Sequence, residues 1–105
     1  MNKELIKGTT ALMVLRLLNR EPMYGYGLIK QLEIVSSGSF QFKEGTLYPI
    51  LHQLEKDGLI DSFWEEAEGR KRKYYKITER GTGALAEKTK EWELFSGAMG
   101  RLMNV

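Results

Sequence analysis

The segment that decides the fold is Glu65-Glu66-Ala67-Glu68-Gly69-Arg70-Lys71-Arg72-Lys73-Tyr74-Tyr75-Lys76. Its first four residues carry three negative charges, whereas residues 69–76 carry five positive charges and no acid. The net charge of the 105-residue chain is only +2, so the information lies in the distribution of charge. A basic, aromatic and β-prone segment that follows a tight turn is typical of a surface that lays cations along a polyanionic backbone.

The residues on both sides of this turn have the pattern of strands. Side-chain types alternate over residues 59–64 and 72–77, and residues 65–70 lie between them, so we predict a β-hairpin. Thr78-Glu79 has the residue types of a helix N-terminus and begins a last helix towards residue 105. Phe40-Gln41-Phe42 also alternates and predicts one further short strand.

Three helices are predicted before the hairpin, over residues 4–19, 24–35 and 44–57, from apolar residues at helical spacing. The inner face of the third helix is expected to consist of Leu47, Ile50, Leu51 and Leu54. Pro49 leaves the start of this helix open. If Thr46 caps the helix, the proline falls in the first turn at little cost, and if the helix begins near Lys43, a kink is expected.

The composition limits the class of protein. With 105 residues, of which 42% are hydrophobic and 29% charged, the chain has room for one small domain with one core. It has no cysteine, a single histidine (His52), no acid pair and no phosphate-binding loop, so we expect neither an enzyme nor a metal or cofactor site. No 18-residue apolar run or signal-peptide pattern occurs, and we expect a soluble cytoplasmic protein without a membrane partner.

The predicted order of helix, helix, helix, hairpin and helix is the winged helix-turn-helix pattern, a mainly α (α+β) fold. Several motifs follow one another along the chain: Tyr24-Gly25-Tyr26, Thr46-Leu47-Tyr48-Pro49, residues 54–60 (Leu-Glu-Lys-Asp-Gly-Leu-Ile), Trp64, residues 69–75 (Gly-Arg-Lys-Arg-Lys-Tyr-Tyr) and residues 77–81 (Ile-Thr-Glu-Arg-Gly). Over roughly residues 5–95 the chain resembles the PadR family of bacterial transcriptional regulators. Gly27 departs from the pattern, since the family often has an acidic residue there.

The resemblance implies a homodimeric, sequence-specific DNA-binding regulator, expected to be a repressor that binds a pseudo-palindromic operator. It implies a DNA-binding domain over residues 1–77 and a C-terminal dimerisation helix over residues 78–105 that packs on the partner subunit. A protein-interaction module with a winged helix but no specific DNA site is the alternative from another class.

The expected DNA contacts lie on the outer face of the third helix, at its approach and in the hairpin. On the helix, the Gln53 amide can donate to and accept from adenine, and the Thr46 hydroxyl can position a phosphate. The full set of expected contacts is Tyr24, Tyr26, Lys43, Thr46, Tyr48, Pro49, His52, Gln53, Lys56, Arg70, Lys71, Arg72 and Lys73. Because side chains alternate along a strand, some of the hairpin cations lie on the opposite face, and Tyr74 and Tyr75 are expected to pack in the core and the hairpin.

The last helix supplies the expected dimer seam. The residues expected at the interface are Leu5, Leu85, Trp92, Phe95, Met99 and Leu102, five of them consistent with a heptad seam on that helix. Gly97 and Gly100 either fray the helix after Ser96 or allow close helix approach. Small members of the family with a single C-terminal helix resemble multidrug sensors, which implies a flat aromatic effector at Met13, Trp92, Phe95 and Met99. The alternative is that Trp92 is only a core anchor of the dimer.

Overall fold

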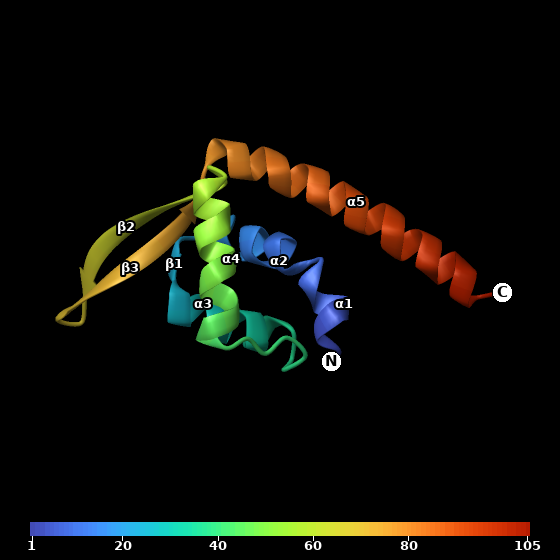
Figure 1. Ribbon diagram of the computed structural model, residues 1–105, viewed down its shortest axis with the longest axis horizontal. Helices are drawn as coiled ribbons and strands as arrows, with labels where there is room; N and C mark the ends of the chain where they lie inside the picture. Colours follow the sequence, from blue (N-terminus) through green and yellow to red (C-terminus); the bar gives the residue numbers. More distant parts are fainter.

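A computed structural model describes all residues 1–105 as a small helical core with a protruding hairpin on one side and a long terminal helix on the other (Figure 1). The elements are α1 (Lys3–Lys7), α2 (Thr10–Leu18), β1 (Met23–Tyr24), α3 (Gly25–Val35), α4 (Glu44–Lys56), β2 (Ile60–Ala67), β3 (Arg70–Ile77) and α5 (Glu79–Met103). The strands form one antiparallel sheet in the order β1-β3-β2. This is the predicted winged helix-turn-helix arrangement.

One hydrophobic core lies where α2, α3 and α4 meet the sheet and the first turns of α5. Its fully buried side chains include Leu15, Leu28 and Tyr75, one each from α2, α3 and β3. On α4, Leu47, Leu51 and Leu54 are buried as predicted, because residues at these spacings lie on one face of a helix, whereas Ile50 is only partly buried at the edge of that face. The opposite face of α4 is therefore left towards solvent.

The N-terminal region differs from the prediction. The helix expected over residues 4–19 is two helices, α1 and α2, with a break at Gly8 and Thr9. At the break the Thr9 hydroxyl donates a hydrogen bond to the Ile6 carbonyl oxygen at 2.9 Å, as the Thr10 hydroxyl does at 3.1 Å. Threonine hydroxyls compete in this way with the backbone N–H groups for carbonyl oxygens. A prediction from apolar periodicity alone does not detect this competition, so it gave one helix where the structure has two.

The third strand of the sheet is also not the one predicted. Residues 40–42 form no strand, and Phe42 packs against the core from an irregular segment. Instead β1 pairs with β3, so that Met23 lies opposite Tyr75 and Tyr24 opposite Tyr74. A two-residue strand is too short to produce alternation in the sequence, so periodicity could not reveal it.

The hairpin of β2 and β3 is longer than predicted, and we call the part from Phe63 to Tyr74 the wing. Only Glu68 and Gly69 form the turn, with φ of 52° and 75°, as a two-residue type I′ turn requires. Glu65 lies opposite Arg72 and Glu66 opposite Lys71. Opposite charges on paired strands stabilise a sheet, so the acidic run extends β2 where a turn was expected.

Of the two possible starts of the third helix, the structure has the one near Lys43. The helix begins at Glu44 with Lys43 as its N-cap residue, and Pro49 lies inside it. The N–H that Pro49 lacks would have served the carbonyl of Gly45, four residues earlier and exposed. Because water can reach this end of the helix, the missing hydrogen bond costs less than it would in the core.

α5 begins as predicted but ends later than the glycines suggested. The Thr78 hydroxyl caps it by accepting a hydrogen bond from the Gly81 N–H at 3.0 Å, and it donates another to the Gly58 carbonyl at 2.7 Å. The helix continues through Gly97 and Gly100 to Met103, so fraying after Ser96 is not observed. Past α2, its end projects beyond the rest of the chain (Figure 1).

Two glycines two residues apart in α5 allow a test of how closely the first turns of the helix pack against the rest of the chain. A Cβ on Gly81 would overlap the backbone carbonyl of Leu59, whereas a Cβ on Gly83 meets nothing within 4 Å. We expect Gly81→Ala to lower the free energy of unfolding by about 2–3 kcal/mol through overpacking. Gly83→Ala should raise it by up to about 1 kcal/mol, because alanine is the better helix former. Urea unfolding of both variants measures this, and equal effects would contradict the close packing of α5 on Leu59.

Candidate nucleic-acid interface

The outer face of α4 is polar and exposed. It carries Thr46, Pro49, His52, Gln53 and Lys56, all exposed and all in the predicted contact set. The Gln53 side-chain amide donates to Asp57 Oδ1 at 3.0 Å, which holds the side chain against the helix and leaves the Gln53 carbonyl oxygen free to accept. Such a row of mixed donors and acceptors on a protruding helix has the chemistry needed to contact base edges in a major groove.

Tyr48 is placed differently from the other predicted α4 contacts. It is half-buried at the side of α4, and its ring lies so close to Gly25 at the start of α3 that a side chain there would overlap it. Burial raises the pKa of the Tyr48 hydroxyl, and the nearby Glu44 carboxylate raises it further. Tyr48 thus joins α4 to α3, and the hydroxyl stays a neutral donor at physiological pH.

One face of the wing is tied to α4 through Glu55. The Ser62 hydroxyl donates to Glu55 Oε2 at 2.5 Å, and Lys73 Nζ lies 3.9 Å from Glu55 Oε1. Lys73 Nζ also lies over the buried Tyr75 ring, 5.5 Å from its centroid. These contacts join the base of the wing to the C-terminal half of α4, so that Lys71 and Lys73 share the face of the wing that is turned towards α4.

The other face of the wing carries Arg70 and Arg72, and Arg72 lies over a cluster of aromatic rings. The Arg72 guanidinium lies 4.4 Å from the Tyr24 ring centroid. Tyr24 packs edge-on against Tyr74, and Tyr74 stacks on Phe63, with centroids 5.7 Å apart in both pairs. A guanidinium over a ring is held in place by the ring quadrupole. Tyr24 therefore positions Arg72, and Tyr74 packs within the sheet as predicted.

Most cations of the candidate interface have no acidic partner. The pair between Lys73 and Glu55 is the single ion pair in the structure, so Lys56, Arg70, Lys71 and Arg72 are not neutralised by a salt bridge. Opposite each other on the strands, Glu65 and Arg72 do not approach within ion-pair distance. Cations that form no salt bridge beside a polar helix favour contact with a polyanion, although the net charge is only +2.

Two predicted residues lie at the approach to this surface. Tyr26 is exposed at the first turn of α3, with Lys30 Nζ 5.4 Å from its ring centroid, and Lys43 is exposed at the start of α4. No group of three or more histidine or acidic side chains is placed to hold a metal ion. None of the helices is both long enough and apolar enough to span a membrane.

The residues predicted for a dimer seam divide into two groups. Leu85 is 6% exposed and belongs to the core of its own chain, which corrects its assignment to a partner surface. The others are exposed large apolar side chains: Leu5 at 72%, Trp92 at 45%, Phe95 at 59%, Met99 at 40% and Leu102 at 64%. Leu85 is buried because the first turns of α5 pack on α2.

Trp92 and Phe95 lie together, with ring centroids 6.1 Å apart. Both line a cavity of about 580 Å³ that also has Leu5 and Leu12 in its wall. Of the predicted effector residues, Met13 and Met99 do not line this cavity. The structure of the single chain thus brings together two of the four residues expected to hold an aromatic effector.

The family model of the "Transcriptional regulator PadR-like family" matches residues 14–87, which include the core, α4 and the wing. The chain belongs to the PadR family. Transcriptional regulator Rv3488 of Mycobacterium tuberculosis is 34% identical over 85 residues, covering 81% of this chain and 77% of that protein.

Two solved structures place this PadR-family chain among known folds. A transcriptional regulator from Clostridium thermocellum is 34% identical with a TM-score of 0.87, covering 94% of this chain and 97% of the other. A PadR-like transcriptional regulator from Bacillus cereus is 30% identical with a TM-score of 0.88, covering 98% and 99% of the two chains. The high coverage shows that α5 is part of the shared fold.

Two residues of this PadR surface have roles that the sequence alone does not reveal. Glu55 lies within one of the family motifs, and its carboxylate contacts both strands of the hairpin, through Ser62 on β2 and Lys73 on β3. Trp64 is also a motif residue, and its indole is 68% exposed, directly opposite Lys73 on the wing. The sequence does contain one sign of this exposure. Trp64 continues the alternating pattern of β2 into the part of the hairpin that extends beyond the core.

The base of the wing should respond to alkaline pH. Burial raises the pKa of the Tyr75 hydroxyl above its ordinary value of 10.0, and Glu55 and Tyr48 raise it further. Because the folded pKa exceeds the unfolded one, the contribution of the neutral phenol is complete below about pH 10 and is lost as the pH rises through the folded pKa. Urea unfolding between about pH 8 and 11 should show a shallower loss of stability in Tyr75→Phe than in the parent protein. Equal slopes would contradict this assignment.

Proposed function

We propose that this PadR-family chain is a homodimeric repressor that binds a specific DNA operator and releases it when an aromatic effector binds at the dimer seam. The observation that carries the DNA-binding part is the exposed polar face of α4 beside a wing whose cations, Lys73 apart, have no acidic partner. Repression follows if the bound dimer covers a promoter.

On DNA, α4 enters the major groove and the wing lies against the flanking backbone. Gln53 and His52 contact base edges, while Thr46 and Lys56 contact phosphates on either side of them. Arg70 and Lys71, near the tip of the wing, neutralise further phosphates, and Arg72 does so from its place over Tyr24. Lys73 contributes less, because Glu55 already partly neutralises it.

The dimer forms through the end of α5. Trp92, Phe95, Met99 and Leu102 recur at three- and four-residue spacings along this end of the helix and are all exposed in the single chain. Exposed apolar side chains in a contiguous stripe favour association. A two-fold axis through this stripe, with Leu5 at its edge, places two copies of α4 on successive turns of the major groove, about 34–36 Å apart. Residues 1–77 then bind DNA, and residues 78–105 provide most of the association surface.

The effector binds at the same seam. Trp92 and Phe95 already lie in contact beside a cavity, so a flat aromatic molecule can enter next to them at little cost in reorganisation. Flexible methionines such as Met99 adapt to ligands of different outline. A ligand that changes how the two subunits pack changes the spacing of the two α4 helices and weakens DNA binding by linkage.

Replacing three wing cations tests the DNA interface. The Arg70→Ala/Lys71→Ala/Arg72→Ala variant should bind the DNA upstream of its own gene roughly tenfold or more weakly in fluorescence anisotropy. The slope of log affinity against log salt should become shallower by about 0.9 for each phosphate that the variant no longer neutralises.

The matched control for this variant removes three exposed cations elsewhere. Arg20→Ala/Lys90→Ala/Arg101→Ala has the same change in net charge and lies outside the proposed interface. If both triple variants lose the same affinity for DNA, the loss is explained by the change in net charge and not by contacts of the wing. Unchanged affinity in the wing variant would remove the wing from the interface, and equal binding of scrambled DNA by the parent protein would favour a protein-interaction module.

Replacing Trp92 tests the effector site. Trp92→Ala should reduce the affinity for a flat aromatic dye at least tenfold, because the indole no longer stacks on the dye or shields it from water. Its far-ultraviolet circular dichroism should be unchanged. Since Trp92 also lies on the proposed dimer surface, the mass in solution is measured in parallel. Leu94→Ala is the control, being exposed on the same helix outside the seam set. Retained dye affinity in a folded Trp92→Ala protein would rule out this site.

A further inference from the structure

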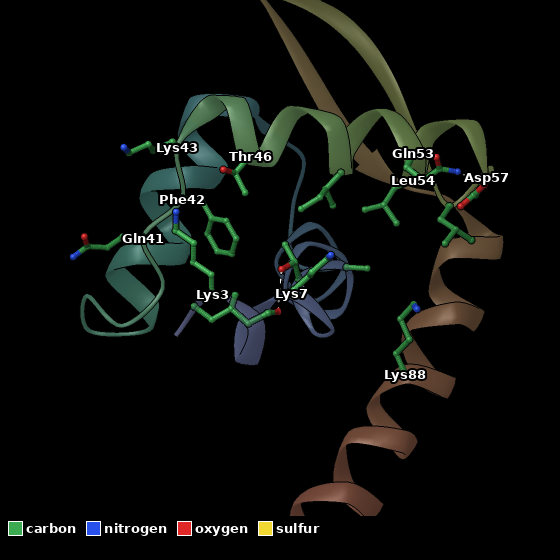
Figure 2. Close-up of a pocket in the computed structure, with 15 residues that line it drawn as sticks. Lys3, Lys7, Gln41, Phe42, Lys43, Thr46, Gln53, Leu54, Asp57 and Lys88 are labelled. Atoms are coloured by element: carbon green, nitrogen blue, oxygen red, sulfur yellow. Dashed lines mark hydrogen bonds between the residues drawn. The ribbon is translucent and has the colours of Figure 1, made fainter. Parts of the chain in front are cut away.

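A second cavity, of about 670 Å³, lies between α4, the N-terminal helices and α5 (Figure 2). On α4 its wall is formed by Thr46, Ile50, Gln53 and Leu54, and Asp57 at the C-cap of the helix continues it. These residues lie on the side of the helix away from Glu55, which contacts the wing. The cavity is thus separate from the wing and shares Thr46 and Gln53 with the proposed DNA surface.

Four lysines are among the residues that line this cavity: Lys3, Lys7, Lys43 and Lys88. None of them forms an ion pair. The single acid in the wall, Asp57, is engaged by the Gln53 amide at 3.0 Å. Figure 2 shows Lys88 pointing from α5 towards α4 and Lys43 pointing outward from the start of α4. Several unpaired cations around one partly enclosed space create a positive potential that favours an anionic group.

Apart from the polar side chains of Thr10 and Gln41, the remaining wall is apolar and mostly aliphatic. Its apolar residues are Ile6, Ala11, Phe42, Ile50, Leu54 and Leu59, of which only Phe42 is aromatic. All of these except Ile6 and Leu54 are partly buried side chains packed against the core, so they present apolar surface to the cavity from a fixed position. An aliphatic floor with cations at its rim suits a chain of methylene groups that ends in an anion.

We propose that this cavity binds a medium-chain carboxylate, the anion of a fatty acid. The alkyl chain lies on the aliphatic floor and the carboxylate is held by Lys7 and Lys88. The volume falls within the usual range for small-molecule sites, about 300–1,000 Å³. This ligand differs in class from the flat aromatic effector proposed for Trp92, and it occupies a neighbouring cavity that shares Ile6 and Lys88 with the one beside Trp92.

We also infer that the ligand weakens DNA binding, an inference that rests on the DNA-binding function proposed above. It contacts Thr46 and Gln53, and it places a negative charge beside the helix that approaches the phosphates. Neutralising the lysines of this flank lowers the positive potential there. The carboxylate therefore weakens the DNA complex without contacting the wing.

Direct binding is tested without DNA, by isothermal titration of the full chain with sodium octanoate, decanoate and dodecanoate below their micelle concentrations. Affinity should increase about fourfold for each added methylene until the cavity is full. Decyltrimethylammonium, with the same chain and a cationic head, should bind at least tenfold more weakly than decanoate. Equal binding of the two head groups would overturn the proposal, because the lysines would then play no part.

Charge reversal locates the ligand. Lys3→Glu/Lys7→Glu should weaken decanoate binding at least tenfold, since both residues line only this cavity. Lys90→Glu/Arg101→Glu is the matched control, with the same charge change at exposed positions of α5 outside it. Circular dichroism confirms that both variants fold. If the control weakens binding as much as the first variant, the site is not this cavity.

A DNA titration separates the two proposals. Decanoate should weaken the complex of the parent protein with its operator at least fivefold, and should do so much less in Lys3→Glu/Lys7→Glu. If decanoate binds but the DNA complex is unaffected, the opposition to DNA is wrong. If no DNA is bound under any condition, the proposed function fails, whereas calorimetry still decides whether the cavity takes a carboxylate.

Discussion

The Thr78 hydroxyl makes the contact on which the arrangement of the molecule depends. It caps α5 by accepting from the Gly81 N–H and donates to the Gly58 carbonyl at the end of α4, while the Thr78 N–H donates to the Leu59 carbonyl at 3.1 Å. One residue thus joins the end of α4, the beginning of β2, the end of β3 and the start of α5. The position of the wing and the direction of the terminal helix are both set from this point.

Much of the fold could be predicted because long helices and strands have apolar residues at regular spacings in the sequence. The span of α3, the buried leucines of α4, the hairpin and the Thr78 cap follow from apolar spacing, alternation and capping residues. Three features could not be found in this way. The break at Thr9 depends on hydroxyl hydrogen bonds, β1 is only two residues long, and residues 40–42 alternate without a partner strand.

The candidate site was predictable in composition but not in orientation. The exposed side chains of α4 and the cations of the wing are those the sequence indicated. The sequence could not show that Tyr48 turns towards Gly25, that Glu55 partly neutralises Lys73, or that Leu85 is used within its own chain. Each of these depends on a neighbour distant along the chain, which a local pattern does not encode.

The close packing of Gly81 on Leu59 has a mechanical consequence. Because backbone meets backbone there, the first turn of α5 cannot tilt independently of the hairpin base and α4. The 25-residue helix then acts as a lever about 37 Å long, at 1.5 Å per residue. A rotation of about 5° at this fulcrum moves its far end by about 3 Å, the scale of motion by which packed interfaces change between discrete arrangements. In the opposite direction, a displacement of a few ångströms at the far end of α5 changes the orientation of α4 by only a few degrees.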